Sequence, residues 1–124
     1  MVDFENNNIF KLKKVDNKTV GSNLEALLIP DEAIIGTYKA IRDYVVFTDK
    51  RVICVNLQGV GKKQDLTSMP YSKIIVFSVE TSGLLDISSE LVLYFGGLGK
   101  VVFEFTGESD IVRIGKIISA FALQ

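Results

Sequence analysis

The sequence predicts an α+β fold, mainly β, in which six to seven antiparallel strands form a bent, partly open barrel capped by a C-terminal helix. Short segments rich in Val, Ile, Tyr and Phe alternate with turn residues from position 33 to position 106. The connections between these segments are too short for parallel crossovers, so neighbouring strands are predicted to be antiparallel. Near the C-terminus the apolar period changes to that of an amphipathic helix.

The N-terminal part of the chain differs in character from the rest. Residues 1–21 are rich in Asn and Lys and carry scattered apolar residues, which predicts a loosely held arm or an irregular edge segment. Ser22 or Asn23 can then cap a short helix over residues 24–28, which a following proline ends. We therefore divide the chain into this arm and a single domain, 22–124.

The strands are predicted where β-branched and aromatic residues cluster between turn signals. They lie near residues 33–41, 44–48, 51–57, 73–81, 90–95 and 100–106. Residues 65–71 add a further candidate, a short strand that ends near Pro70. The single cysteine, Cys54, falls inside a strand, so no intrachain disulfide can form and a buried apolar thiol is expected.

The last segment has helical periodicity. Apolar residues recur there at three- and four-residue spacing, which places them on one face of a helix: Ile111, Ile114, Ile117, Ile118 and Phe121. Ser109 or Asp110 can cap this helix. Gly115 lowers helix propensity, but it permits a close approach to the sheet that the helix covers.

Composition and charge exclude several classes of function. The chain has no histidine, so the common near-neutral proton shuttle and metal ligand is absent, and Cys54 has no histidine partner. A formal net charge of -1 predicts no general field for nucleic acid or an anionic membrane. No apolar stretch has the length of a transmembrane helix or a signal peptide. We expect a cytoplasmic protein without catalytic activity, cofactor or metal.

Several linked motifs resemble those of bacterial pleckstrin-homology (PH) domains. The first is Phe47-Thr48-Asp49-Lys50-Arg51-Val52-Ile53, a turn followed by a β-branched strand, which is similar to the second hairpin of that family. Further similarity lies at Gly61-Lys62-Lys63, Met69 to Ile74, Phe77 to Thr81 and Asp86 to Leu91. The resemblance covers roughly residues 24–124 and rests on several motifs rather than on one.

The resemblance implies a PH-like fold, cytoplasmic residence, no enzymatic activity and a tendency to form ring-shaped homo-oligomers. It implies no particular ligand. Eukaryotic phosphoinositide-binding relatives carry several cations around the first hairpin loop, whereas here that turn is Arg42-Asp43 with Lys39 nearby. Because the Asp43 charge offsets part of the attraction, the lipid-binding function of those relatives is not transferred to this chain.

Apolar residues on both faces of the predicted strands indicate a surface for protein–protein contacts. In the segments 44–47, 74–77 and 91–95, apolar side chains alternate onto both sides, and two short helices leave part of the outer surface uncovered. We therefore predict self-association, with these outer-face residues at subunit contacts: Tyr44, Val46, Leu91 and Leu93. The alternative is a monomer in which the helices and the arm cover every strand.

Two other kinds of binding stay open. Basic residues near the turns form an anion-binding patch if the hairpins align, which suits a lipid headgroup or another anionic ligand: Lys50, Arg51, Lys62, Lys63 and Lys73. An unpaired strand at the edge of the sheet can instead accept an extended peptide. The sequence does not distinguish these partners from a second copy of the chain, and it leaves membrane association open.

Overall fold

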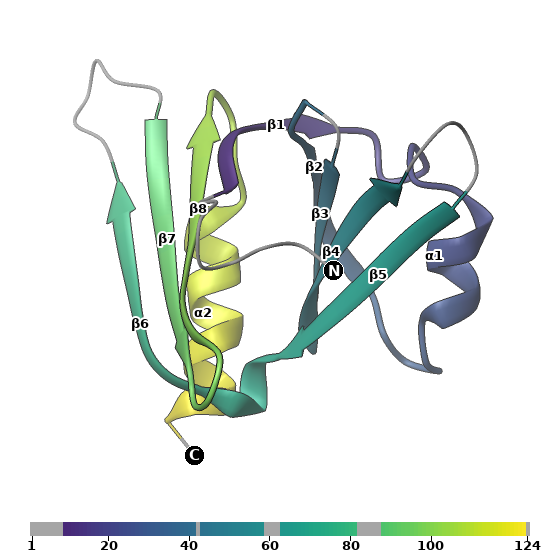
Figure 1. The fold of residues 1–124 in the computed structure, drawn as a ribbon. Coiled ribbons are helices and arrows are strands. Elements are labelled where there is room, and N and C mark those ends of the chain that lie inside the picture. Colours follow the sequence, from purple (N-terminus) through teal and green to yellow (C-terminus); the bar gives the residue numbers. More distant parts are fainter. Residues whose placement is uncertain (1–8, 42, 59–62, 82–87, 124) are drawn as a thin grey trace.

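The described part of the chain forms one strongly bent eight-stranded sheet with two helices (Figure 1). The computed structural model describes residues 9–41, 43–58, 63–81 and 88–123. The helices are α1 (Ser22–Leu27) and α2 (Ile111–Ala122), and a 3-10 turn, η1 (Tyr71–Lys73), joins β5 to β6. The strands are β1 (Ile9–Val15), β2 (Ile34–Lys39), β3 (Asp43–Thr48), β4 (Arg51–Gln58), β5 (Lys63–Pro70), β6 (Ile74–Thr81), β7 (Ser88–Phe95) and β8 (Gly99–Thr106).

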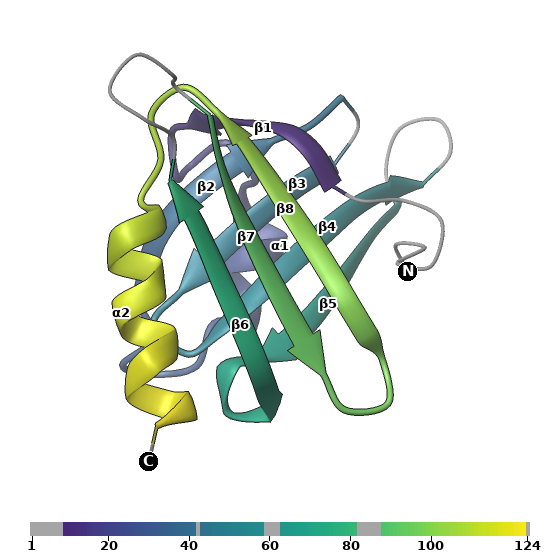
Figure 2. The same cartoon turned by 90° about the vertical axis from the view of Figure 1, so that its left-hand side faces the viewer.

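The strand order is β5-β4-β3-β2-β1-β8-β7-β6, so β5 and β6 each have one neighbour in the sheet. Consecutive strands from β2 to β5 and from β6 to β8 pair antiparallel. β1 joins the two halves, because it pairs antiparallel with β2 and parallel with β8. The sheet folds back on itself as a partly open barrel, and α2 packs against η1 and β6 (Figure 2). The predicted fold class is confirmed.

The main core lies between the two halves of the bent sheet. Its aromatic centre includes an edge-to-face pair of Tyr38 and Phe105, with ring centroids 4.8 Å apart, and a similar pair of Phe47 and Phe103 at 5.5 Å. Pairs of this geometry stabilise a core beyond the area that they bury. The predicted apolar face of α2 closes this core with three buried side chains: Ile111, Ile114 and Ile118.

Helix α1 covers the outer face of β3 and β4. Val46, Ile53 and Val55 point away from the barrel interior and pack with Val20 and Leu24 in a second apolar cluster. Figure 1 shows α1 outside the sheet, beside β4 and β5. The chain itself therefore buries both faces of these central strands, which accounts for their continuous apolar sequence.

Residues 9–15, which the sequence assigned to a loose arm, form the central strand β1. Only alternate side chains of a strand reach a core, and here Leu12 is completely buried while Lys11 and Lys13 are exposed. The exposed lysines made the segment resemble a solvated arm. The candidate strand at 65–71 is also longer than expected, because β5 has eight residues. With β1 included, the sheet has eight strands.

The start of α1 differs from the sequence prediction, whereas α2 begins at one of the two predicted residues. The N-cap position of α1 is Gly21, and its φ of 91° lies in the left-handed region that favours glycine. Asp110 occupies the N-cap position of α2, but its side chain makes no capping hydrogen bond. The predicted close approach at Gly115 is confirmed, because a Cβ atom there would lie 3.2 Å from Val79 Cγ2. Cys54 is buried, as expected.

Candidate functional site

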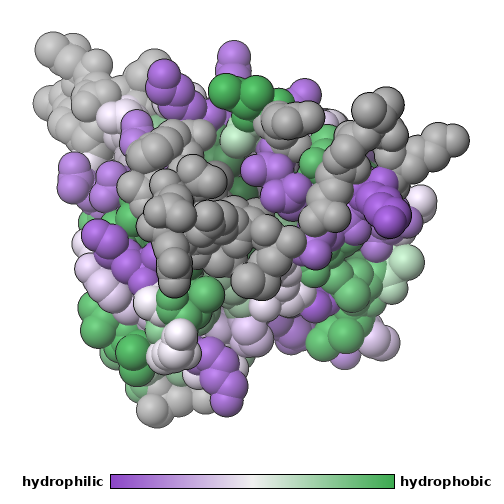
Figure 3. All heavy atoms as spheres, viewed as in Figure 1, coloured by the Kyte–Doolittle hydropathy of each residue, from purple (hydrophilic) through white to green (hydrophobic). Residues whose placement is uncertain are grey.

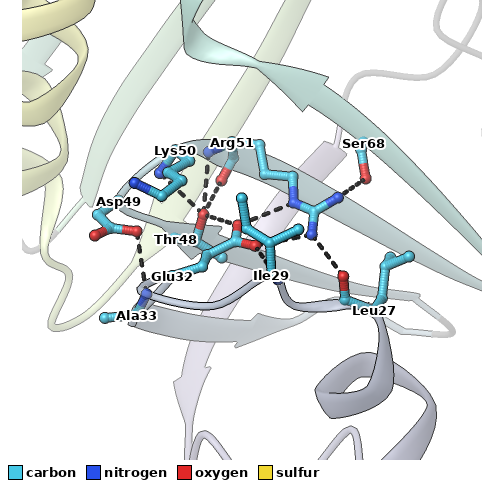
Figure 4. Close-up of polar contacts among 9 residues, drawn as sticks. All are labelled: Leu27, Ile29, Glu32, Ala33, Thr48, Asp49, Lys50, Arg51 and Ser68. Carbon is cyan, nitrogen blue, oxygen red and sulfur yellow. Dashed lines mark hydrogen bonds and ion pairs between the residues drawn. The ribbon is translucent and has the colours of Figure 1, made fainter.

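The turn between β3 and β4 is held by hydrogen bonds around Thr48 (Figure 4). The Thr48 hydroxyl accepts the backbone N–H groups of Lys50 and Arg51 at 3.1 and 3.0 Å. The same hydroxyl donates to Glu32 Oε2 at 2.6 Å. A threonine before a two-residue loop thus closes the hairpin and ties it to the segment that precedes β2.

Arg51 and Glu32 form a buried, bidentate ion pair in this network. Arg51 Nε lies 2.9 Å from Glu32 Oε2, and Arg51 Nη2 lies 2.8 Å from Glu32 Oε1. The guanidinium also donates to the Leu27 carbonyl at the end of α1 and to the Ser68 hydroxyl on β5, both at 3.0 Å. The Glu32 side chain is completely buried, and that of Arg51 is 17% exposed. The pair therefore joins α1, β4 and β5.

The surroundings of Glu32 keep its carboxylate ionised. Burial favours the neutral acid, but hydrogen bonds from Arg51, Thr48 and the Ile29 N–H, together with the Arg51 charge, outweigh it and hold the Glu32 pKa below its usual range. This negative charge neutralises the guanidinium that the sequence assigned to an anion-binding patch. The contacts give Arg51 a structural role, and its guanidinium already has an anionic partner within the chain.

Among the other predicted anion-binding residues that the structure describes, Lys50 and Lys73 lie near each other and Lys63 lies apart. Lys50 lies at the β3–β4 turn, and Lys73 lies in η1, whose first residue donates its N–H to the Lys50 carbonyl at 3.1 Å. Lys63 is the first residue of β5, and the strand ends at η1 seven positions later. At about 3.3 Å per residue, these seven positions place Lys63 about 23 Å from η1. Lys62 lies outside the described residues. The strands therefore separate Lys63 from the cations with which it was expected to converge.

A second polar cluster fixes the start of α2. The Tyr38 hydroxyl donates to Asp110 Oδ2 at 2.6 Å and accepts the Asp110 N–H at 2.7 Å. Lys14 Nζ, from β1, donates to Asp110 Oδ1 at 3.1 Å. Burial and the neighbouring Asp110 carboxylate raise the pKa of Tyr38 well above its usual range, so the hydroxyl stays a neutral donor. Because its carboxylate is bound in this cluster, Asp110 does not cap its own helix.

An open hollow of about 440 Å³ lies beside the first turn of α2 and is lined by Ser109, Asp110, Val112, Arg113 and Lys116. Its carboxylate is already held by Tyr38 and Lys14. The exposed basic side chains on α2 lie on the solvent face of an amphipathic helix, where such residues are common. We therefore assign this hollow no ligand.

The four predicted interface residues do not share an exposed face. Leu91 and Leu93 point into the barrel core, Val46 packs in the cluster beneath α1, and all three are completely buried within one chain. Tyr44 is half-buried on the outer face, with Lys39 Nζ 5.6 Å from the centroid of its ring. Successive side chains of a strand alternate between its two faces. The prediction assigned Leu91 and Leu93 to the outer face of β7, but both belong to the face that points into the core.

Apolar side chains are exposed on the outside of β6 and β7. Val76 lies directly opposite Tyr94, on the face away from the core. Ile75 and Val76 are 69% and 56% exposed, and Leu98 in the β7–β8 turn is also exposed. Figure 3 shows apolar surface at the lower left, where Figure 1 places the start of β6 and the end of β7. Neither described helix covers this outer face, in contrast to the outer face of β3 and β4.

The described residues offer little of the chemistry on which catalysis usually depends. No group of three or more acidic or cysteine side chains among them is placed to hold a metal ion. The Cys54 thiol is buried in the core, and burial raises its pKa well above the usual range, which is typical of an unreactive thiol. In the described part of the chain, no helix is both long and apolar enough to span a membrane.

Sequence patterns alone did not reveal the partners in either polar cluster. Arg51 gave one indication of such a partner. An arginine at the start of an apolar strand needs an acidic partner if its side chain is buried. The acid is Glu32, which lies just before β2. No local signal connects Tyr38 with Asp110, since 72 positions separate them in the sequence.

Comparison with known proteins identifies relatives along nearly the whole chain. Residues 3–122 match the family model described as bacterial PH domain. The uncharacterized protein YjqA of Bacillus subtilis is 39% identical over 107 residues, which cover 84% of this chain and 86% of that protein. A solved DUF1696-family protein with a pleckstrin-homology domain, from Shewanella loihica, is 36% identical with a TM-score of 0.70, over 91% of this chain and 98% of that chain. A solved pleckstrin-homology domain from Shewanella amazonensis is 39% identical with a TM-score of 0.59, over 89% and 90%.

Proposed function

This chain belongs to the bacterial PH domain family, and on that premise we propose that it is a non-catalytic binding and assembly module that forms homo-oligomers. The observation that carries the proposal is the exposed apolar surface outside β6 and β7, with Ile75, Val76, Tyr94 and Leu98. Apolar surface of this kind favours burial against a partner. The ring shape expected of the assembly comes from the family resemblance.

The rest of the fold supports a partner outside the chain. Helix α1 covers the outer face of β3 and β4, and α2 packs against η1 and β6 on the side of the core. A formal net charge of -1 opposes the approach of a second copy only weakly. Self-association therefore buries the outside of β6 and β7 without a large electrostatic cost.

Light scattering on an eluting peak, at tens of micromolar protein, tests the proposal. We expect a single mass several times 13.7 kDa, the mass of one chain. Val76→Lys should lower that mass, because it places a charge in the apolar surface. Val112→Lys is the matched control, since Val112 is also exposed but lies on α2. A wild-type chain that elutes as a monomer contradicts the proposal.

Peptide binding at a sheet edge is a second candidate, favoured by the composition of β6. This strand ends the sheet and has no Lys, Arg or Pro, whereas β5 at the other edge carries Lys63, Asp65 and Pro70. Charged residues and proline discourage strand addition, so β6, which has Glu80 as its one charged residue and no proline, is the more receptive edge. An extended apolar peptide that binds the chain and protects the β6 amides from hydrogen exchange would identify this function.

The anionic-lipid alternative has less support, because Arg51 is neutralised by Glu32 and Lys63 lies far from Lys50 and Lys73. Binding to vesicles of mixed neutral and anionic lipid tests it directly. Binding that falls steeply with salt and is lost in Lys50→Glu/Lys73→Glu would restore this alternative.

A further inference from the structure

Strand β1 joins the two halves of the sheet through short and irregular pairing (Figure 1). It pairs with β2 only over Lys13–Val15, and its register with β8 shifts between Ile9 and Leu12. Lys11 lies within this shift and has a φ of 53°, in the left-handed region where a Cβ atom crowds the backbone. By contrast, β7 and β8 pair without a shift from Ser88 to Phe95. The main-chain pairing that holds β1 is therefore weaker than that between β7 and β8.

A pair of like charges also opposes the placement of β1. Lys13 lies directly opposite Lys39 on β2, where the Cβ atoms of facing side chains are about 4.5–5.5 Å apart and like charges repel. On the other side, Leu12 pairs with Phe105 of β8, so the next position sets Lys13 beside the uncharged Thr106. Neither directly neighbouring strand position supplies an acid for Lys13.

Two side chains hold β1 in place. Leu12 is completely buried in the main core. Lys14 Nζ donates to Asp110 Oδ1 at 3.1 Å and lies 3.8 Å from Glu108 Oε1, which ties β1 to the start of α2. A segment with an aliphatic residue in place of Leu12 and a base in place of Lys14 would reproduce both contacts. An acid between the two would replace the like-charged pair with an ion pair to Lys39.

We propose that β1 is a displaceable strand, and that the slot it occupies between β2 and β8 is a binding site for an extended segment of another protein. The segment carries an aliphatic residue, an acid and a base in succession, at the positions of Leu12, Lys13 and Lys14. Its main chain takes over the pairing of β1 with both neighbouring strands. Neither β6 nor β7 takes part, so displacement of β1 is independent of the proposed self-association.

The chain can release β1 without releasing α1. Residues 16–19, which follow β1, are exposed, whereas Val20 and Leu24 are buried in the second apolar cluster over β3 and β4. Release of β1 is thus a local opening that leaves the rest of the fold packed. Because Leu12 must leave the core, few chains are open at any time, and the apparent affinity for the segment falls in proportion to that fraction.

Fluorescence anisotropy with labelled synthetic peptides tests the slot. A peptide of residues 9–16 that carries Lys13→Glu should bind the full chain saturably and about fivefold more tightly than the natural sequence, because it places an acid opposite Lys39. A peptide that also carries Leu12→Ala should lose binding. The chain variant Lys39→Glu should reverse the preference between the first two peptides, whereas Lys73→Glu, at an exposed lysine outside the slot, should keep it.

Weakening the hold on β1 gives a readout that a merely structural role would not produce. Lys14→Ala removes the bond between β1 and Asp110 and so increases the fraction of open chains. It should therefore raise the apparent affinity for the peptide. An affinity that falls in a folded Lys14→Ala chain would count against displacement of β1.

A disulfide that locks β1 in place provides the decisive comparison. Val15 and Thr37 lie directly opposite each other, and the Thr37 hydroxyl has no hydrogen-bond partner among the described residues, so cysteine can replace it without losing a bond. Oxidised Val15→Cys/Thr37→Cys should not bind the peptide, and reduction should restore binding.

The matched control is Ser78→Cys/Val92→Cys, which links β6 to β7 and should bind equally in both states. Mass spectrometry verifies each cross-link, and circular dichroism verifies that each chain is folded. Equal binding by the oxidised and reduced Val15→Cys/Thr37→Cys chain, or no saturable binding of the acidic peptide by the wild type, overturns the inference and leaves the proposed function standing.

Discussion

Replacing Arg51 with methionine should destabilise the fold strongly, because it leaves the completely buried Glu32 without its counter-ion. Removing one partner of a buried ion pair costs about 3–5 kcal/mol of unfolding free energy. At about 0.05–0.15 kcal/mol per residue, a domain of 124 residues is stable by about 6–19 kcal/mol, so the loss is a large part of the total. The variant also loses the hydrogen bonds to Leu27 and Ser68.

The pH dependence distinguishes this explanation from a packing defect. In the wild type the Glu32 pKa lies below its ordinary value of 4.5, so the pair stabilises the fold fully above that value and loses its effect as pH falls through the folded-state pKa. In Arg51→Met the hydrogen bond and the charge of Arg51, which both lower the Glu32 pKa, are lost, so the folded-state pKa rises above its wild-type value. Protonation of Glu32 then stabilises the variant relative to the wild type as pH falls through this raised pKa, so acidification should narrow the difference in unfolding free energy between the two chains.

Urea unfolding followed by far-ultraviolet circular dichroism measures both effects. Each chain is compared at one fixed concentration, because self-association adds to apparent stability. The double variant Glu32→Gln/Arg51→Met is the control; it should recover more than half of the loss, since no unpaired charge stays buried. A deficit below about 1 kcal/mol at pH 7.5, or a double variant no more stable than Arg51→Met, would refute the reasoning.

Three further predictions follow from the core and from the start of α2. Gly36→Ala should cost about 1–3 kcal/mol, because its Cβ atom would lie 2.5 Å from Asp110 Oδ2; unchanged thermal stability would contradict this. Tyr38→Phe leaves the Asp110 N–H without its acceptor and should cost about 1–3 kcal/mol in urea unfolding, and a loss of a few tenths would show that water replaces the hydroxyl. Cys54 should resist alkylation by a maleimide in the native state and react on unfolding, because its thiol is buried; rapid native labelling would be inconsistent with the fold.

Two residues of the motifs that carry the family resemblance have structural roles. Thr48 and Arg51, from the motif at the β3–β4 turn, hold that turn and bind Glu32. In this chain the network uses a hydroxyl before the loop and a fork-shaped cation after it. The guanidinium of Arg51, which the sequence assigned to a possible anion-binding patch, is thus bound to a carboxylate of the same chain.

Local properties were predicted well, because they depend on a few neighbouring residues. The β-branched segments marked most strands, and the three- and four-residue spacing from Ile111 to Phe121 marked α2. The strand β1 was missed because its inward face offers one buried side chain, Leu12, between exposed lysines. A short alternating pattern of that kind also occurs in solvated arms.

By itself the sequence determined the PH-like class, the extent of most elements, the burial of Cys54 and the close approach at Gly115, since backbone propensity and apolar period are local. Only the tertiary structure decided which face of β7 is buried, because the alternation of side chains is the same for either choice. It also brought Glu80, Glu90 and Glu104 side by side on neighbouring strands. Which charges lie next to each other depends on strand register, and register cannot be read from any one strand alone.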